Sequence, residues 1–287
     1  MRIDLQFHST YSDGSLTPAQ LVNFLSKQKV RVAALTDHNT VAGLDEFFAA
    51  CRRKKIKPIS GIEFYVRYGS KKMNFLFYNF DRKAPELRLF LEKTQAQRRK
   101  NITKALEFWQ ERGMNIDIEK ILSRYNYYIP INGVIKLLKK DVGNRKKIKE
   151  DLKSNDPHEW EIIRYYFKNR NKYYLNETHV SIARLKKLHQ RIGGKIILAH
   201  PAKQKVQKEI IIKLLKEKII DGVEILSPHH SWDTISYYYH ILKNKKIILT
   251  GGSDFHGFSS RSARLNCSWQ YFKIDSKLLR KIEDIIK

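Results

Sequence analysis

The 287-residue chain has only two cysteines, Cys51 and Cys267. Two cysteines are too few for a disulfide framework or a thiolate zinc site, and Cys51 is expected to be a small buried residue inside a helix. No run of about 18 apolar residues is present, which excludes a membrane-spanning helix. The N-terminus, MRIDLQFHST, lacks the apolar core of a secretory signal. A cytoplasmic protein without a membrane partner is therefore expected.

Several common motifs are also missing. The sequence contains no G-x-S-x-G nucleophile elbow, no G-x-x-x-x-G-K-[ST] phosphate loop and no G-x-G-x-x-G dinucleotide fingerprint. It shows no helix-turn-helix or zinc-finger pattern, which argues against a sequence-specific DNA-binding protein. Any catalytic site in this chain should therefore be of a kind other than these three.

Acidic residues are scarce, because 29 Asp and Glu stand against 56 Lys and Arg, a formal net charge of +27. Positive charge attracts polyanions such as nucleic acid. The basic runs at 52–55, 98–100, 145–149 and 243–246 are scattered, however, and abundant Lys, Ile and Asn are typical of AT-rich coding sequence. The charge alone leaves a nucleic-acid partner and plain surface composition as open alternatives.

Strand-like and helix-like segments alternate at both ends of the chain. The expected strands are 3–8, 32–35, 58–64, 75–80, 195–199, 222–226 and 247–249. Such alternation predicts a parallel sheet, and roughly seven strands favour closure into a barrel. The fold class is therefore α/β, with a barrel formed by 1–81 and 175–287.

Residues 82–174 break this alternation. They are dense in Lys and Arg and show a helical pattern over 87–109, which predicts a helical insertion subdomain. Aromatic residues at 125–128, 165–167 and 173–174 are interleaved there with cations that include Arg164, Lys168 and Arg170. Two interpretations stay open: these rings stack on the bases of a single strand, or they pack the insertion onto the barrel.

Side chains suited to metal binding and acid–base chemistry follow one predicted strand after another. They are His8, Asp13, Asp37, His38, Glu63, His200, Asp254 and His256. In a barrel of parallel strands, the carboxyl ends meet where the active site lies. Imidazole and carboxylate ligands without cysteine favour Zn²⁺, Mn²⁺ or Fe²⁺. Water bridging two such ions gives hydroxide at neutral pH, which suits attack on a phosphate ester.

Five segments, in order, resemble the motifs of the PHP (polymerase and histidinol phosphatase) family. They are Asp4–Gly14, Leu35–Thr40, Gly61–Glu63, Ala199–Pro201 and Gly252–Gly257. The helical middle and Gly193-Gly194-Lys195 resemble the branch of RNase AM-type 5′→3′ exoribonucleases and nucleoside 3′,5′-bisphosphate phosphatases. The resemblance implies a distorted (β/α)₇ barrel holding one to three divalent ions, with an anionic phosphate-ester substrate such as a nucleotide or short RNA or DNA.

The resemblance also implies a role for each site residue. One ion would be held by His8, Glu63 and Asp254, and Glu63 would bridge to a second ion bound by His200. A third ion would be held by Asp13, His38 and His256. The catalytic set would be Asp37, His38, Glu63 and His256, with Asp37 orienting the ligands from behind. Lys203 replaces an arginine of the branch and would bind the substrate phosphate, with charge but without a bidentate grip.

Three departures from the family pattern affect this prediction. Gln6 and Asn74 stand where histidines are expected, so both would be weak oxygen ligands. Pro130–Ile135, the best counterpart of a phosphate-binding segment in the branch, has neither its Arg nor its His. Two functions stay open: a metal-dependent phosphoesterase, and a degenerate PHP domain that binds or scaffolds. His229 and His230, after the strand at 222–226, belong either to the cleft or to a polar loop.

Overall fold

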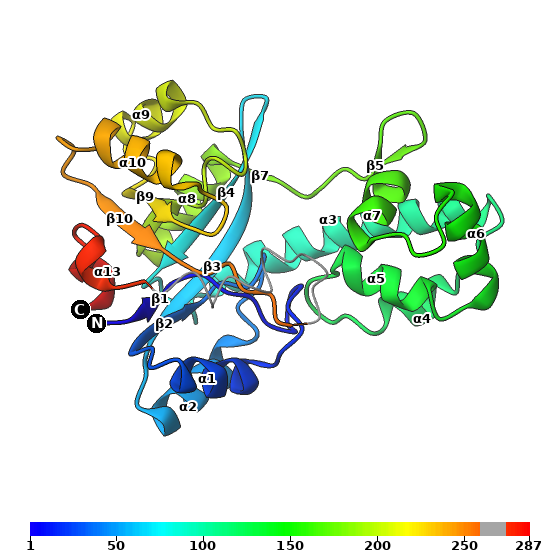
Figure 1. The fold of residues 1–287 in the computed structure, drawn as a ribbon, viewed down its shortest axis with the longest axis horizontal. Helices are drawn as coiled ribbons and strands as arrows, with labels where there is room; N and C mark the ends of the chain where they lie inside the picture. The colour runs from blue at the N-terminus through cyan, green and yellow to red at the C-terminus, as the bar shows by residue number, and fades with distance from the viewer. Residues whose placement is uncertain (259–273) are drawn as a thin grey trace. The chain divides into compact units, whose positions relative to one another are not determined.

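The computed structural model describes residues 1–258 and 274–287, so Cys267 lies outside the described part. The chain forms two compact units, shown in Figure 1. Unit 1 consists of Met1–Phe90 and His179–Lys287, and unit 2 of Leu91–Thr178. The expected insertion, 82–174, starts earlier than unit 2 because α3 (Pro85–Gln110) is one continuous helix that belongs to both units.

Unit 1 is built on one sheet with the strand order β1-β2-β3-β4-β8-β9-β10, and β7 pairs with β3. The strands are β1 Ile3–Asp4, β2 Val32–Leu35, β3 Lys57–Tyr68, β4 Lys71–Tyr78, β7 Val180–Ser181, β8 Lys195–Leu198, β9 Gly222–Leu226 and β10 Ile248–Gly251. All pairs are parallel except those of β4, which runs antiparallel to β3 and β8. Only Gly69 and Ser70 join β3 to β4, too few residues for a parallel crossover. The expectation of an all-parallel sheet is therefore wrong for β4.

The two ends of the sheet are joined by irregular backbone hydrogen bonds rather than by a regular strand pair. The N–H of Asp254 donates to the carbonyl of Gln6 at 2.8 Å, and the N–H of His8 donates to the carbonyl of Phe255 at 2.9 Å. Gly252 lies in this seam, and a Cβ there would stand 2.3 Å from the Cβ of Gln6. The segments that follow β1 and β10 thus lie side by side.

Helices cover the sheet of unit 1. They are α1 Pro18–Lys27, α2 Leu44–Lys54, α8 Ile182–Ile192, α9 Lys208–Lys216, α10 Trp232–Ile241, the 3₁₀ turn Ser276–Leu278 and α13 Glu283–Ile286. Local sequence sets the start of α1, where the Thr17 hydroxyl accepts the N–H of Gln20 at 3.3 Å and Pro18 takes the first helical position. Its apolar face, including Leu21 and Leu25, is buried. In Figure 1, α1 and α2 lie beside β1 and β2, and α9 and α10 lie beside β9 and β10.

Unit 2 has its own hydrophobic core. Its elements are the later part of α3, α4 Ile118–Leu122, α5 Ile131–Leu138, α6 Val142–Leu152, α7 Glu159–Phe167, and a hairpin of β5 Lys168–Asn169 and β6 Tyr173–Tyr174. Tyr166 and Phe167 are buried in this core, whereas Tyr127 and Tyr174 are 46% and 45% exposed. The interleaved aromatic residues therefore divide into core and surface positions. None of the helices in the described residues is long and apolar enough to cross a membrane.

Candidate metal centre

The side chains predicted at the strand ends converge on one site in unit 1. Two groups each place one ligand atom per residue within 4.8 Å of the others. These groups are His8, Asp13, His38 and His256, and His8, Glu63 and Asp254. His8 belongs to both, so the two groups are contiguous. Because parallel strands end at the same edge, residues far apart in the sequence meet here.

Glu63, on β3, lies at the centre of the site and is fully buried. Its Oε2 atom is 3.1 Å from Nε2 of His8 and 3.5 Å from Nδ1 of His38, and its Oε1 atom is 3.2 Å from Nε2 of His200. Burial alone would raise the pKa of Glu63, but the neighbouring His38, His200 and His8 hold it well below its usual value. The residue is therefore a carboxylate with an imidazole on each side.

Asp254, after β10, contacts three cationic or imidazole groups. Its Oδ1 atom is 3.2 Å from Nε2 of His8, and its Oδ2 atom is 2.5 Å from Nε2 of His229 and 2.9 Å from Nζ of Lys203. Burial would raise the pKa of Asp254, but these neighbours and His256 lower it well below its usual value. His229, left open from the sequence, thus lies in the site because it follows β9.

His230, its neighbour in the sequence, has a different place. Its Nδ1 atom lies 2.8 Å from the carbonyl of Ile225, and its Nε2 atom accepts the N–H of Ala202 at 3.4 Å. Burial lowers the pKa of His230 to about 4, so its ring is neutral at neutral pH. It therefore braces the loop after β8 through backbone contacts.

Asp13 joins three imidazoles at the more open side of the site. Its Oδ1 atom is 3.4 Å from Nε2 of His256 and 3.7 Å from Nδ1 of His8, and its Oδ2 atom is 3.6 Å from Nε2 of His38. Burial lowers the pKa of His38 to about 4, so that ring is neutral and has a lone pair to offer. The pKa of Asp13 is lowered in spite of burial, by His256 and His38, which keeps it ionised.

The separations and the donor set fit a divalent metal ion. Two atoms that each lie about 2.0–2.2 Å from one tetrahedral ion are roughly 3.3–3.6 Å apart, close to the 3.1–3.7 Å separations of the predicted ligands. Nδ1 of His8 and Oε1 of Gln6 are buried and have no hydrogen-bond partner among the described residues. Buried polar atoms are normally satisfied, so these two are well suited to coordinate a cation.

The two altered family positions both contact Glu63. The Gln6 amide donates from Nε2 to Oε2 of Glu63 at 3.2 Å, and the Asn74 amide donates from Nδ2 to Oε1 at 2.6 Å. Asn74 reaches Glu63 because β4 is antiparallel: Leu76 pairs with Glu63, which puts Asn74 diagonally across on the same face. Both amides therefore lie at the predicted centre and serve as hydrogen-bond donors to Glu63 in this structure, and their role as weak ligands stays a prediction.

Asp37 lies behind the ligands. Its Oδ1 atom accepts the N–H of Ser9 at 2.7 Å and the hydroxyl of Ser12 at 2.5 Å, and its Oδ2 atom accepts the hydroxyl of Ser9 at 2.6 Å. Ser9 follows His8, and Ser12 precedes Asp13. Asp37 therefore fixes the loop that carries these two side chains, and its role in orienting bound ligands stays a prediction.

Two buried carboxyl groups were not singled out from the sequence. Glu224, on β9, accepts the N–H of His200 at 2.9 Å, and that residue has a φ of +22°. Asp4, on β1, accepts the N–H and the hydroxyl of Ser253 at 2.9 and 2.7 Å, next to Asp254. Burial raises the pKa of Asp4 to about 7 and that of Glu224 well above its usual value. Glu224 lies in the middle of β9 and Asp4 is the last residue of β1, so a search of the residues that follow strands does not find either one.

Together, the sheet and the site define an α/β protein with a multi-ligand centre of imidazoles and carboxylates. A family model described as PHP domain matches residues 4–177, more than half of the chain, and the chain therefore belongs to the PHP domain family. The predicted family is confirmed.

Three relatives carry functional names. The chain is 24% identical over 268 residues to a 3′,5′-nucleoside bisphosphate phosphatase of Chromobacterium violaceum, covering 88% of this chain and 87% of the relative. It is 26% identical over 256 residues to a phosphoribosyl 1,2-cyclic phosphate 1,2-diphosphodiesterase of Eggerthella lenta, covering 88% and 94%. A 5′-3′ exoribonuclease of Haemophilus influenzae is 37% identical over 99 residues, only 34% of this chain and 36% of that relative. All three names describe cleavage of phosphate esters, in agreement with the predicted class of reaction.

One solved structure shows the fold. A predicted metal-dependent phosphoesterase from Bifidobacterium adolescentis superposes with a TM-score of 0.73 over 95% of this chain and 96% of its own, at 18% sequence identity. Its likeness confirms the α/β fold class expected from the sequence.

Proposed function

We propose that this chain is a metal-dependent hydrolase of a phosphate ester in a nucleotide or short oligonucleotide. The observation that carries the proposal is the pair of contiguous ligand groups, which share His8 and have Glu63 between three imidazoles. The relatives named as a bisphosphate phosphatase and an exoribonuclease support the substrate class. Lys203 adds a cation beside Asp254. The side chain of Lys203 is 40% exposed, so an anionic substrate can approach it.

We assign the ligands to ions as the family resemblance implies, and the short distances between their atoms support this assignment. His8, Glu63 and Asp254 would hold one divalent ion, Glu63 and His200 would hold part of a second, and Asp13, His38 and His256 would hold a third. Mn²⁺, Zn²⁺ and Fe²⁺ suit such ligands. When bound, the ions supply Lewis acidity, which stabilises charge on phosphoryl oxygens and lowers the pKa of water.

The protein's own residues prepare this chemistry. The low pKa of Glu63 and of Asp254 keeps both carboxylates charged without loss of a proton on binding. Nδ1 of His256 lies 2.6 Å from the carbonyl of Asp254, and donation there leaves Nε2 of that ring to face Asp13. Asp37 holds the loop of His8, and Lys203 positions the phosphate as a point charge rather than by a bidentate grip.

The alternative is a PHP domain that binds its ligand with little or no catalysis. The specific observation in its favour is that Gln6 and Asn74 both donate to Glu63, where the family has imidazoles. In this second function the remaining ligands would hold an ion without assembling the reactive centre.

The two functions separate in one experiment. Metal content is measured by inductively coupled plasma mass spectrometry, and hydrolysis is measured on bis(p-nitrophenyl) phosphate, a nucleoside 3′,5′-bisphosphate and a short RNA. We expect at least one ion per chain and turnover of at least one substrate. The His256→Ala change should abolish turnover, whereas His240→Ala, at an exposed histidine of α10, should not. Full metal loading without turnover of any phosphate ester would refute the hydrolase and favour the binding module.

A further inference from the structure

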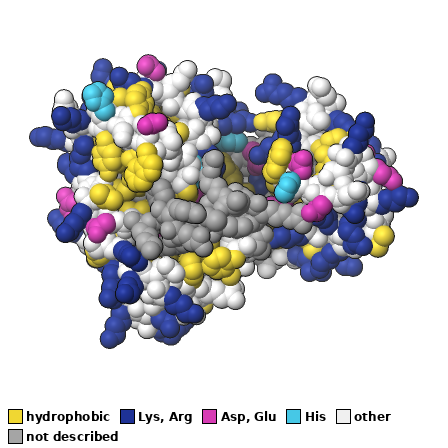
Figure 2. Space-filling model, viewed as in Figure 1, with side chains coloured by type: hydrophobic (Ala, Val, Ile, Leu, Met, Phe, Trp, Pro, Cys, Tyr) yellow, Lys and Arg dark blue, Asp and Glu magenta, His cyan; other side chains and the backbone are white. Residues whose placement is uncertain are grey.

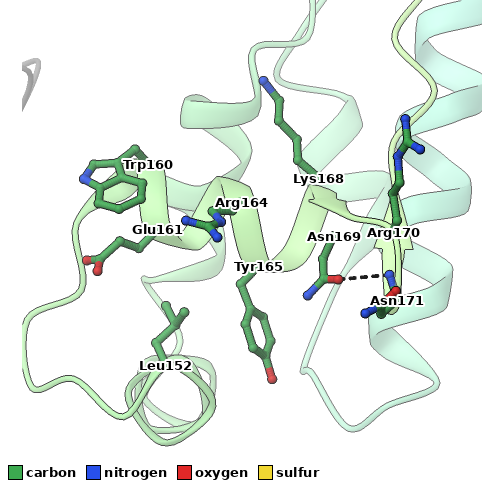
Figure 3. Close-up of a pocket in the computed structure, with 9 residues that line it drawn as sticks. All are labelled: Leu152, Trp160, Glu161, Arg164, Tyr165, Lys168, Asn169, Arg170 and Asn171. Carbon is green, nitrogen blue, oxygen red and sulfur yellow. Dashed lines mark hydrogen bonds between the residues drawn. The ribbon is translucent and has the colours of Figure 1, made fainter.

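Unit 2 contains a pocket of its own, at the junction of α6, α7 and the β5–β6 hairpin. Its volume is about 500 Å³. The lining residues are Leu152, Trp160, Glu161, Arg164, Tyr165, Lys168, Asn169, Arg170 and Asn171, drawn in Figure 3. All of them belong to unit 2, and none takes part in the metal centre.

The pocket is rich in cations that lack acidic partners. No ion pair to Arg164, Lys168 or Arg170 occurs among the described residues, although Asp and Glu pair with other basic residues of unit 2. The lining has one carboxylate, Glu161, and it accepts the N–H of His158 at 2.7 Å as part of the cap of α7. Three cations around one pocket, against a single carboxylate that is engaged in the helix cap, suit a ligand with several negative charges.

The pocket also has an exposed aromatic face. The indole of Trp160 is 59% exposed, which is unusual for so large an apolar side chain. Arg164 lies one turn further along α7, and Figure 3 shows the two side chains on the same side of the helix. The ring of Tyr165 is already covered by Lys172, whose Nζ atom stands 3.7 Å from the ring centre. Trp160 is therefore the ring of the pocket that is open to a planar ligand.

The hairpin adds amide groups to this surface. Oδ1 of Asn169 accepts the N–H of Asn171 at 3.0 Å, which fixes the turn and leaves the amide NH₂ of Asn169 to donate. Side-chain amides beside an aromatic ring can hydrogen-bond to the edge of an unstacked base. Cations, an open ring and amides thus occur together on one short segment, 160–171.

We propose that this pocket binds single-stranded nucleic acid, with a base stacked on Trp160 and neighbouring phosphates paired with Arg164, Lys168 and Arg170. Base stacking beside cations is the common chemistry of single-strand binding. A duplex is excluded as the preferred ligand because its bases are already stacked on one another. The proposal deepens the proposed function, since it makes an oligonucleotide the substrate class, but its binding test does not depend on hydrolysis.

The test is a fluorescence anisotropy titration of the full chain with 12-nucleotide single strands of RNA and DNA and with a 12-base-pair duplex. It is run in wild type and in a Glu63→Gln background, so that hydrolysis does not consume the probe. Trp160→Ala should raise Kd about 5- to 150-fold, the span of one lost base stack, and Trp160→Phe should restore most of the affinity. Replacing Arg164, Lys168 and Arg170 together by Gln should lower the salt-dependence slope by about 2, or about 0.7 per phosphate.

A charge-matched control uses three exposed lysines of unit 2 outside the pocket, Lys104, Lys120 and Lys146, also replaced by Gln. We expect the control triple to bind within about threefold of wild type and the duplex to bind more weakly than either single strand. The proposal would be overturned if the two triple variants lost the same amount of affinity for the single strand. It would also be overturned if Trp160→Ala weakened the binding of the oligonucleotide and of inorganic polyphosphate equally. Either result would mean that general positive charge attracts the ligand, as the spread of Lys and Arg in Figure 2 permits. A hydrolase that fails on every substrate would leave this binding result intact.

Discussion

Glu63 and Glu224 are suited to paired mutagenesis because both are fully buried glutamates of one sheet, and their pKa values are shifted in opposite directions. The pKa of Glu63 lies well below its usual value because of three neighbouring histidines, which outweigh burial. Burial raises the pKa of Glu224 well above its usual value. Glu63→Gln therefore removes a charge, whereas Glu224→Gln replaces a protonated carboxyl group with an amide of similar shape.

The structure sets the size of each effect. The Glu63 carboxylate accepts two amide N–H groups and lies within 3.2 Å of nitrogens of His8 and His200. An amide retains one acceptor and turns an NH₂ group towards former donors, so Glu63→Gln should destabilise the metal-free chain by about 3–5 kcal/mol, the usual effect of removing one partner of a buried ion pair. Glu224→Gln still accepts the N–H of His200 and should change stability by less than about 1 kcal/mol near pH 5.

The two variants should also differ in their pH dependence. Glu63, with a depressed pKa, contributes stability above its unfolded pKa, and this contribution is lost as pH falls. Glu224 acts with the opposite sign, since the unfolded carboxyl group ionises near pH 4.5 while the folded one stays protonated. The contribution of Glu224 to stability is therefore lost as pH rises from about 4.5 towards its folded pKa. Glu224→Gln should become more stable relative to wild type as pH rises above about 5.

Urea unfolding followed by circular dichroism measures these differences, and isothermal titration of Zn²⁺ or Mn²⁺ measures the centre directly. Glu63→Gln should weaken metal binding by at least about 10–100-fold, taking the loss of an indirect contact as the lower bound. Glu224→Gln should stay within about tenfold of wild type. Equal damage from both substitutions would refute the assigned charge states, and wild-type affinity in Glu63→Gln would refute its place as a shared ligand.

Three further changes test other parts of the structure. Gly252→Ala places a Cβ 2.3 Å from Cβ of Gln6, so the free energy of unfolding measured in urea should fall by at least about 2 kcal/mol. Asn74→His restores the family's imidazole and should tighten metal binding about 10–100-fold in calorimetry; unchanged affinity would show that position 74 is no ligand position. Burial raises the pKa of Cys51 to about 12, so in a Cys267→Ser chain Ellman's reagent at pH 8 should label it only after urea unfolding.

The positions of most predicted ligands could be read from the sequence because two signals mark the end of a strand: the apolar run stops, and a polar group follows it. A short apolar run such as 32–35 ends in a polar group, and the next residues, Asp37 and His38, are the ones that reach the site. Parallel strands then bring these ends together without further information. His229 also follows a strand, but the sequence does not distinguish a site residue there from a residue of an ordinary polar loop. Its contact with Asp254 in the structure places it in the site.

Other parts of the site depend on pairing that the local pattern does not encode. Asn74 reaches Glu63 only because β4 reverses direction, and that reversal follows from a two-residue connection rather than from the apolar run itself. Glu224 and Asp4 sit within strands, where a charged residue in the sequence is normally taken as solvent-facing. Their burial is possible because Glu224 accepts the backbone N–H of His200 and Asp4 accepts that of Ser253, next to Asp254.

The replacements at Gln6 and Asn74 bear unequally on the two ligand groups. Both amides contact Glu63, and an amide is a weaker metal ligand than the imidazole it replaces. The replacements therefore weaken the binding of those ions that Glu63 would hold. The group of His8, Asp13, His38 and His256 contains neither amide, and its atoms still lie within 4.8 Å of one another. The substitutions therefore change how firmly the shared carboxylate holds its ions more than whether an ion can bind at all. On this reasoning the proposed hydrolase would bind one ion firmly and the ions at Glu63 more weakly. The metal concentration that its turnover requires should then be higher than the concentration that fills the first site.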